Sequence, residues 1–350
     1  MTTQDGLARL FYGVGLALMI GWILVIGRTI FLPIFMSIIV AYVVLGLAEL
    51  IGRVPGFEGI PASLRYAFAI VVSLGLMALI VWLIVQNATQ VSTLVPVYQD
   101  QLLALVQRGA VAVGLDDEPS WQSLRRDLVG HMNLHRVVLG SVVSVASIIG
   151  TFAVILIYAA FILSEQKSFS NKIARLSDQP AKVTQIRELI RDVNRRIGTY
   201  LVIKSLINIA LGVASYVIML VHGIEFAGFW AILIGLLNYI PYFGGIVGVA
   251  LPCFLVLLEH GEIWPVIAFI LIMSIPQVAL GNFIEPRLMG NSLNVSPFVI
   301  LVSLAVWTSL WGIVGAILAV PIMAILVIIL SEIDATRPIA VLLSKDGSLN

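Results

Sequence analysis

Six polar side chains interrupt the apolar C-terminal half of the chain and are its best candidates for chemistry: Lys204, Asn208, Asn238, Gln277, Asn282 and Glu285. Polar groups inside a membrane are costly, so they usually face a cavity or a partner. An amide offers both hydrogen-bond donors and acceptors, so we expect Asn238 and Gln277 to contact a neutral, hydroxylated solute. Hydrogen bonding between helices is the alternative role for these two amides.

The two charged residues of this set lie near the ends of predicted spans. Lys204 is expected to extend its ammonium group to the cytoplasmic interface, as long basic side chains near a membrane edge do. Glu285 precedes Pro286 and lies near Arg287, which favours a local ion pair at the membrane edge over a buried proton carrier. Glu285 is also the acid nearest to Gln277, and this makes it the candidate for coupling transport to an ion.

An apolar block from Phe226 to Leu258 positions Asn238. As one helix this block would be roughly 50 Å long, whereas a bilayer core is only ~30 Å thick. Asn238, Pro241, Gly244 and Gly245 favour a broken backbone in its middle, so we expect a re-entrant hairpin. Broken backbone at membrane depth needs protein or water around it. The predicted substrate-binding residues are therefore Asn238, Pro241, Gly244, Gly245, Gln277 and Asn282.

A second apolar block, from Pro297 to Ser331, would be roughly 52 Å long as one helix. A break is expected around Trp307 to Gly312, and the predicted hairpin-breaking residues are Gly312, Gly315 and Pro321.

The two blocks also share sequence. Gly245-Ile246-Val247-Gly248 recurs as Gly312-Ile313-Val314-Gly315, and Ile209-Ala210-Leu211-Gly212 resembles Val278-Ala279-Leu280-Gly281. Each half reads as one span followed by one broken hairpin, and the halves start on opposite sides. This pattern predicts an inverted repeat, an architecture that suits alternating access. Chance is the alternative in a chain so rich in these residue types.

Composition places the whole chain in an all-α, polytopic membrane class. It is 60% hydrophobic and 11% charged, whereas soluble domains average about 25% charged residues. The net charge of +1 gives no reason to expect nucleic acid. The one cysteine, Cys253, lies in an apolar run, so disulfides and thiolate metal clusters are not expected.

Searches for enzyme motifs give no support for catalysis. The chain has no phosphate-binding Gly-Lys-Ser/Thr loop and no His-Glu-x-x-His motif. His131 and His135 have i, i+4 spacing but lack a nearby third ligand. We therefore expect no enzyme, no cofactor and no metal site.

Basic residues orient the spans. Residues 165–196 carry eight Lys and Arg against four acids, which places this stretch in the cytoplasm. Both termini are then cytoplasmic, and 14 of the 20 Lys and Arg lie inside. The expected segments are a scaffold of N-terminal spans (1–86), extracytoplasmic or interfacial amphipathic helices or a solvated domain (87–136), a fourth span with a basic cytoplasmic helix (137–196), a transport domain (197–331) and a cytoplasmic tail (332–350).

Two runs within residues 200–330 form a specific pattern. The first is Leu237-Asn238-Tyr239-Ile240-Pro241-Tyr242-Phe243-Gly244. The second combines Gln277, Asn282 to Gly290, Pro297, Trp311 to Gly315 and Ala319 to Pro321. These motifs resemble the autoinducer-2 exporter (AI-2E) family of predicted permeases. The N-terminal half is similar only in its span pattern and in the basic 165–196 link.

The resemblance implies a secondary transporter with about eight membrane segments that assembles as a homo-oligomer, specifically a pentamer. The family's named activity is export of a furanone-like quorum-sensing signal, and other members are associated with sodium or lithium efflux in exchange for protons. Many members carry an acid shortly after the matching glutamine. Here Leu280 and Gly281 follow instead, which disfavours cation antiport.

The sequence thus predicts a secondary transporter in the bacterial inner membrane that exports a small polar organic solute, with autoinducer-2 as the named candidate. Alternating access, in an elevator-like form, is the expected mechanism, with the two hairpin tips meeting around the solute. A sodium or lithium/proton antiporter and a non-transport membrane scaffold are the alternatives. The expected partners are the lipid bilayer, the solute and further copies of the chain.

Overall fold

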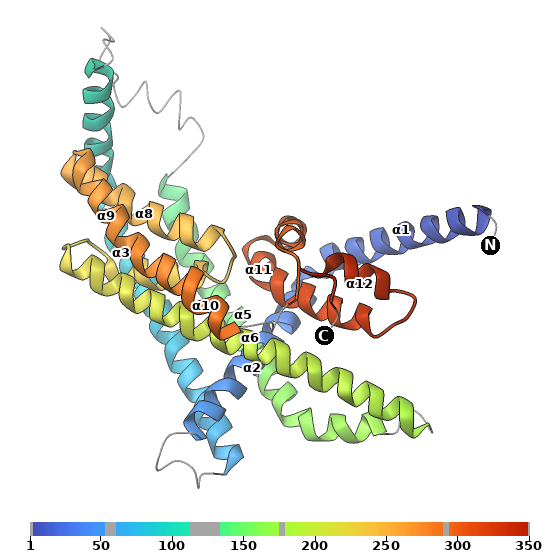
Figure 1. The fold of residues 1–350 in the computed structure, drawn as a ribbon. Helices are drawn as coiled ribbons and strands as arrows, with labels where there is room; N and C mark the ends of the chain where they lie inside the picture. The colour runs from blue at the N-terminus through green and yellow to red at the C-terminus, as the bar shows by residue number, and fades with distance from the viewer. Residues whose placement is uncertain (1–2, 53–60, 113–133, 175–178, 290–293, 349–350) are drawn as a thin grey trace. The chain divides into compact units, whose positions relative to one another are not determined.

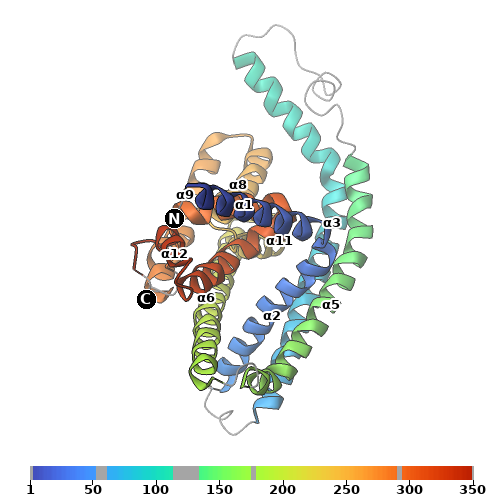
Figure 2. The same cartoon turned by 90° about the vertical axis from the view of Figure 1, so that its right-hand side faces the viewer.

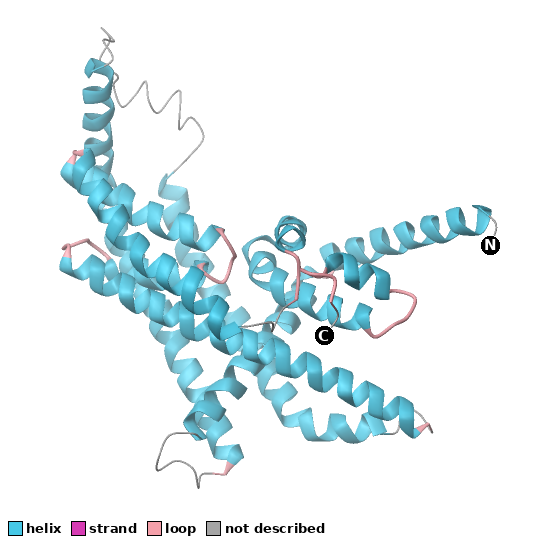
Figure 3. Cartoon of the chain, in the orientation of Figure 1, coloured by secondary structure: helices cyan, strands magenta, loops and turns pink. Residues whose placement is uncertain are grey.

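A computed structural model describes residues 3–52, 61–112, 134–174, 179–289 and 294–348, and the regular elements in these ranges are helices (Figure 3). The first half contains α1 (Thr3–Ile26), α2 (Arg28–Gly52), α3 (Ala62–Ala112) and α5 (Leu134–Ala174). The second half contains α6 (Pro180–Val221), α7 (Ala227–Leu237), α8 (Phe243–His260), α9 (Ile263–Val278), the π-helix η1 (Ala279–Ile284), α10 (Glu285–Met289), α11 (Pro297–Ser331) and α12 (Arg337–Leu343).

Four helical stretches in the described ranges are long and apolar enough to cross a membrane: Arg28–Gly52, Pro180–Val221, Ile263–Met289 and Pro297–Ser331. Shorter apolar helices include α7 and most of α8. The all-helical, membrane-protein class expected from composition is therefore confirmed. The count of about eight segments and the re-entrant path of the hairpins stay predictions.

Two helices are longer than the sequence pattern indicates. α3 continues from the third predicted span into the amphipathic stretch, and α6 joins the basic cytoplasmic helix to the fifth span. A change from polar to apolar residues marks the membrane boundary but does not end a helix, because both Arg and Leu are good helix formers. His131 lies outside the described residues.

Contacts divide the chain into two compact units whose boundaries fall inside α3, α5, α6 and α10. Unit 1 comprises residues 1–70, 151–202 and 289–350, and unit 2 comprises residues 71–150 and 203–288. Each unit is built from segments that are distant in the sequence.

In unit 1, α2 packs against the adjoining parts of α3 and α5, and the three helices run alongside one another in Figure 2. Val44 and Ala48 of α2 meet Ala69 of α3, and Leu163 of α5 packs against them. Trp311 of α11 ties a second part of the unit together, because its indole nitrogen donates to the Leu24 carbonyl of α1 at 2.9 Å.

Helix α11 folds back on itself at Gly312, whose φ of 64° and ψ of −146° are not helical. The Ser303 hydroxyl donates to the Ala319 carbonyl at 3.1 Å, although these residues would be about 24 Å apart in a straight helix. A Cβ on Gly315 would lie 1.9 Å from the Trp307 carbonyl oxygen. The expected break is therefore present at Gly312. Gly315 instead allows the two halves to approach, and Pro321 is buried within the second half.

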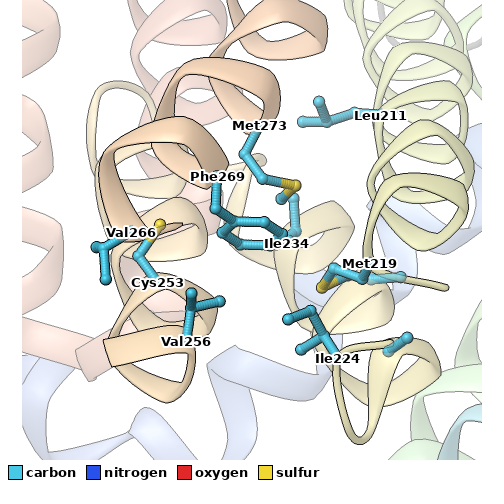
Figure 4. Packing of buried hydrophobic residues seen from close by; sticks show 11 residues of the cluster. Leu211, Met219, Ile224, Ile234, Cys253, Val256, Val266, Phe269 and Met273 are labelled. Atoms are coloured by element: carbon cyan, nitrogen blue, oxygen red, sulfur yellow. The ribbon is translucent and has the colours of Figure 1, made fainter. Parts of the chain in front are cut away.

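Unit 2 contains the last part of α6 together with α7, α8 and α9, and α8 packs against both α7 and α9 (Figure 1). Figure 4 shows its core, where Phe269 and Met273 of α9 point toward Ile234 of α7. Leu211 and Met219 of α6 belong to the same cluster. Between apolar helices in a membrane, close packing of this kind is the main source of association.

Small residues bring α6 and α7 into backbone contact. Ala227, Ala231 and Gly235 recur every four residues on α7, and a Cβ on Gly235 would lie 3.1 Å from the Asn208 carbonyl oxygen. A Cβ on Gly212 of α6 would lie 3.2 Å from the Ala231 carbonyl oxygen. This small-xxx-small spacing is typical of tightly packed membrane helices.

The first apolar block is also broken, between α7 and α8. Tyr242 has φ 63° and ψ −39°, and the Phe243 N–H donates to the Pro241 carbonyl at 2.7 Å. This is a γ-turn with positive φ, a strained conformation for a non-glycine residue. The turn brings Gly244 against the end of α7, so that a Cβ there would lie 2.3 Å from the Leu237 carbonyl oxygen. The residues from Asn238 to Gly245 are called the hairpin tip below.

Gly312→Ala is expected to destabilise the protein by about 1–3 kcal/mol, because the backbone conformation at this position is open essentially only to glycine. The measurement is the midpoint of thermal unfolding of the purified protein in detergent. Gly75→Ala, at a helical glycine with nothing within 4 Å of its added Cβ, is the matched control and should be neutral or slightly stabilising. Equal midpoints for the two variants would contradict this account of the kink.

Gly244→Ala is expected to cost about 1–3 kcal/mol, because the added methyl group overlaps backbone atoms that cannot move aside cheaply. The same thermal measurement applies, with Gly281→Ala as control, since a Cβ on Gly281 meets nothing within 4 Å. If Gly244→Ala unfolds at the wild-type temperature, the close approach of the tip to α7 is not a constraint on the fold.

Candidate functional site

The hairpin tip of unit 2 has polar side chains from α6 and α9 around it. The Asn238 side-chain nitrogen donates to Asn208 Oδ1 on α6 at 2.7 Å. The Tyr239 hydroxyl shares a hydrogen bond of 2.7 Å with the Ser205 hydroxyl, in which either oxygen can donate. From α9, the side-chain oxygen of Gln277 approaches Gly245, where a Cβ would lie 3.4 Å from it.

Two amide groups around the tip keep unused hydrogen-bonding capacity. Asn208 is 4% exposed, and its Nδ2 faces the Tyr239 hydroxyl without reaching it at hydrogen-bond geometry. Gln277 Nε2 is likewise buried without a partner. Buried polar atoms in folded proteins are nearly always paired, so each exception calls for an explanation. A bound solute is one such explanation, because both open groups are N–H donors that could meet its oxygen atoms.

A buried ion pair lies one helical turn from Asn208. Lys204 Nζ donates to both carboxylate oxygens of Glu285, at 2.8 and 3.0 Å. The side chains are 7% and 19% exposed. Glu285 pairs with Lys204 rather than with the neighbouring Arg287, so the expected local partner was wrong. The actual partner comes from another helix, 81 residues along the chain. The position of Lys204 at a membrane interface stays a prediction.

Most residues predicted to bind substrate lie at this place in unit 2. Asn238, Pro241, Gly244 and Gly245 form the tip, and Gln277 faces it. Asn282 is exposed and lies in η1, one turn before Glu285. A π-helix of this kind inside a longer helix is frequent at functional sites. The residues predicted to break the second hairpin, Gly312, Gly315 and Pro321, belong to unit 1.

On α6, Lys204 and Asn208 were among the six polar residues singled out from the sequence but were not predicted to bind substrate, and Ser205 was not singled out. Lys204 and Asn208 are four residues apart and Ser205 lies between them, so all three project from neighbouring positions of one turn. This i, i+4 spacing of polar residues within an apolar span is a signal that the sequence does contain. Tyr239 was also missed, although it lies inside the motif that carries the family resemblance.

The groups at the site can bind and orient a molecule, and none of them forms a catalytic arrangement. Within the described ranges, no three His, Cys, Asp or Glu side chains come together to hold a metal ion. The site consists of amides, hydroxyls and one ion pair with no net charge. Polar groups of this kind inside a membrane protein usually face a cavity or a partner.

The chain is similar to membrane transport proteins along most of its length. The sequence model of the family described as "AI-2E family transporter" matches residues 14–335 of the chain. The AI-2 transport protein TqsA of Escherichia coli K12 is 33% identical over 193 residues, 54% of this chain and 54% of that protein. A "Putative transport protein" of Haemophilus influenzae is 30% identical over 260 residues, 74% of this chain and 73% of that protein. A protein of the same description from Borreliella burgdorferi is 29% identical over 204 residues.

The chain spans only about half the length of the Borreliella and TqsA proteins that it matches, 55% and 54% respectively. The family match, in contrast, covers nearly all of the chain and includes both broken helical blocks. The protein therefore belongs to the AI-2E transporter family, a family of membrane transport proteins.

Proposed function

We propose that the protein exports a small, uncharged, oxygen-rich solute by alternating access and that the solute binds at the α7–α8 hairpin tip. The observation that carries this proposal is the break in the helix beside two buried amide donors that have no partner. Transporters of several folds bind substrates where helices are interrupted near the bilayer midplane.

The chemistry of the open groups defines the solute. Asn208 Nδ2 and Gln277 Nε2 both donate, so a solute with carbonyl, ether or hydroxyl oxygens would complete them. The nearby charges of Lys204 and Glu285 cancel each other. An uncharged solute is therefore favoured over an anion or a cation, because no net charge remains to offset its desolvation.

Autoinducer-2 is the first solute to assay. This choice rests on the description of TqsA as an AI-2 transport protein and on the match between an oxygen-rich molecule and two amide donors. We further propose an inner-membrane location with both termini in the cytoplasm, since the basic residues favour that orientation. Assembly as a homo-oligomer and a re-entrant course for both hairpins are part of the same proposal.

The sodium or lithium/proton antiporter is the weaker alternative. It requires a carboxylate that is free to bind and release a cation, whereas Glu285 is held by Lys204 through both of its oxygens. A membrane scaffold without transport activity is the other alternative, and the following experiment separates it from the proposal.

Gln277→Leu is expected to reduce transport at least about tenfold, the effect of losing one good hydrogen bond to a bound solute. Uptake of autoinducer-2 into inside-out membrane vesicles measures export. The thermal midpoint should stay the same or rise, because the substitution replaces a half-buried amide, whose buried Nε2 has no partner, with an apolar group of similar size. A role for Gln277 in structure alone would lower stability instead and leave transport intact.

Ser215→Ala is the matched control. Like Gln277, Ser215 has a buried polar atom without a partner, but it lies on α6, about two turns from Asn208 and away from the tip. This variant should transport at the wild-type rate. Wild-type flux in Gln277→Leu vesicles would remove the proposed site, and an absence of flux in every protein, the wild type included, would favour another solute or the scaffold.

A further inference from the structure

The ion pair between Lys204 and Glu285 differs from two ion pairs at the surface, Lys172–Glu165 and Arg195–Asp192. The side chains of these two pairs are 46–69% exposed, and exposed pairs of this kind contribute little. Lys204 and Glu285 are withdrawn from solvent, next to the polar groups around the hairpin tip. Burial of two charges is expensive, so a pair kept at such a place is a candidate for function.

The geometry around Glu285 is that of a carboxylate binding a single monovalent cation. Both carboxylate oxygens face one positive centre, at 2.8 and 3.0 Å. The ammonium group of Lys204 supplies that centre from α6, the helix that also presents Ser205 and Asn208 to the tip. An ammonium carries the same charge as Na⁺ or Li⁺ but is covalently attached, so it cannot leave.

We propose that the Lys204 ammonium occupies the position that a coupling Na⁺ or Li⁺ would take at Glu285, so that this protein moves its solute without binding either ion there. Lys204 is then the residue that determines ion specificity. Its removal opens a monovalent cation site at the Glu285 carboxylate. The inference goes beyond the solute site, and its test measures cation binding, so either proposal can fail while the other stands.

The choice of cation follows from charge and burial. A carboxylate that loses its buried partner must take up a proton or another cation, because an unpaired charge is not tolerated at low dielectric. At alkaline pH the proton is scarce, and a small monovalent cation is the remaining choice. Carboxylate oxygens suit such hard cations.

The experiment uses the full-length protein, purified in detergent at pH 8.5. Sodium or lithium chloride is titrated against choline chloride at constant ionic strength while the thermal midpoint is measured. Lys204→Ala should gain about 3 °C between 1 and 100 mM sodium for a Kd of about 1 mM, because a ligand that binds only the folded state raises the midpoint. The wild type and Lys204→Arg should show no difference between sodium and choline.

The double variant Lys204→Ala/Glu285→Gln is the control for the site, and it should lose the sodium effect. A Lys204→Ala protein that folds but responds equally to sodium and choline overturns the proposal. If Lys204→Ala does not fold, the wild-type titration still tests whether a cation binds at Glu285. A sodium-specific rise in the wild-type midpoint that is absent from Glu285→Gln would show that a cation binds at Glu285 in spite of Lys204, and would equally overturn it.

Discussion

Every backbone polar group that leaves a helix within an apolar layer must find another partner, and this constraint organises the protein. Both long apolar blocks break, at Tyr242 in one and at Gly312 in the other. At the first break, the bonds Gly244 N–H to Ile240 and Phe243 N–H to Pro241 satisfy the turn locally. The side chains around the tip supply further polar groups. A water-free layer tolerates such a break only when these partners are in place, and the same partners create the means to bind a solute.

The breaks themselves could be predicted from sequence because they follow from length and residue type. Each block is longer than a bilayer core is thick, is apolar throughout and carries glycine or proline near its middle, so a single untilted span is disfavoured. The role of each glycine was not predictable. Gly244 meets the backbone of Leu237, Gly245 faces Gln277, and Gly315 faces Trp307 across a kink. These differences depend on which surfaces meet in three dimensions, and residue type alone does not reveal that.

Side-chain contacts between distant parts of the chain were the main feature that could not be predicted from the sequence. Asn238 was expected to bind either solute or another helix, and its side chain bonds Asn208, while Gln277 keeps an open donor. Asn238 and Gln277 are both amides, but Asn238 uses its donor in a contact between helices, whereas Gln277 does not. Lys204 was expected at an interface because long basic side chains usually reach one. Its carboxylate partner lies 81 residues away, and pairing over such a distance cannot be read from local spacing.

The contact between α6 and α7 has a mechanical consequence. Ala231 and Gly235 bring the two backbones together at Gly212 and Asn208 with no bulky side chain between them, so neither helix can slide past the other by changing a rotamer. We therefore expect the turn that follows α7 and the stretch of α6 that faces it to move as one rigid body. The hydrogen bond from the Asn238 amide to Asn208 Oδ1 also joins the two segments, so we expect the tip and this stretch of α6 to move together.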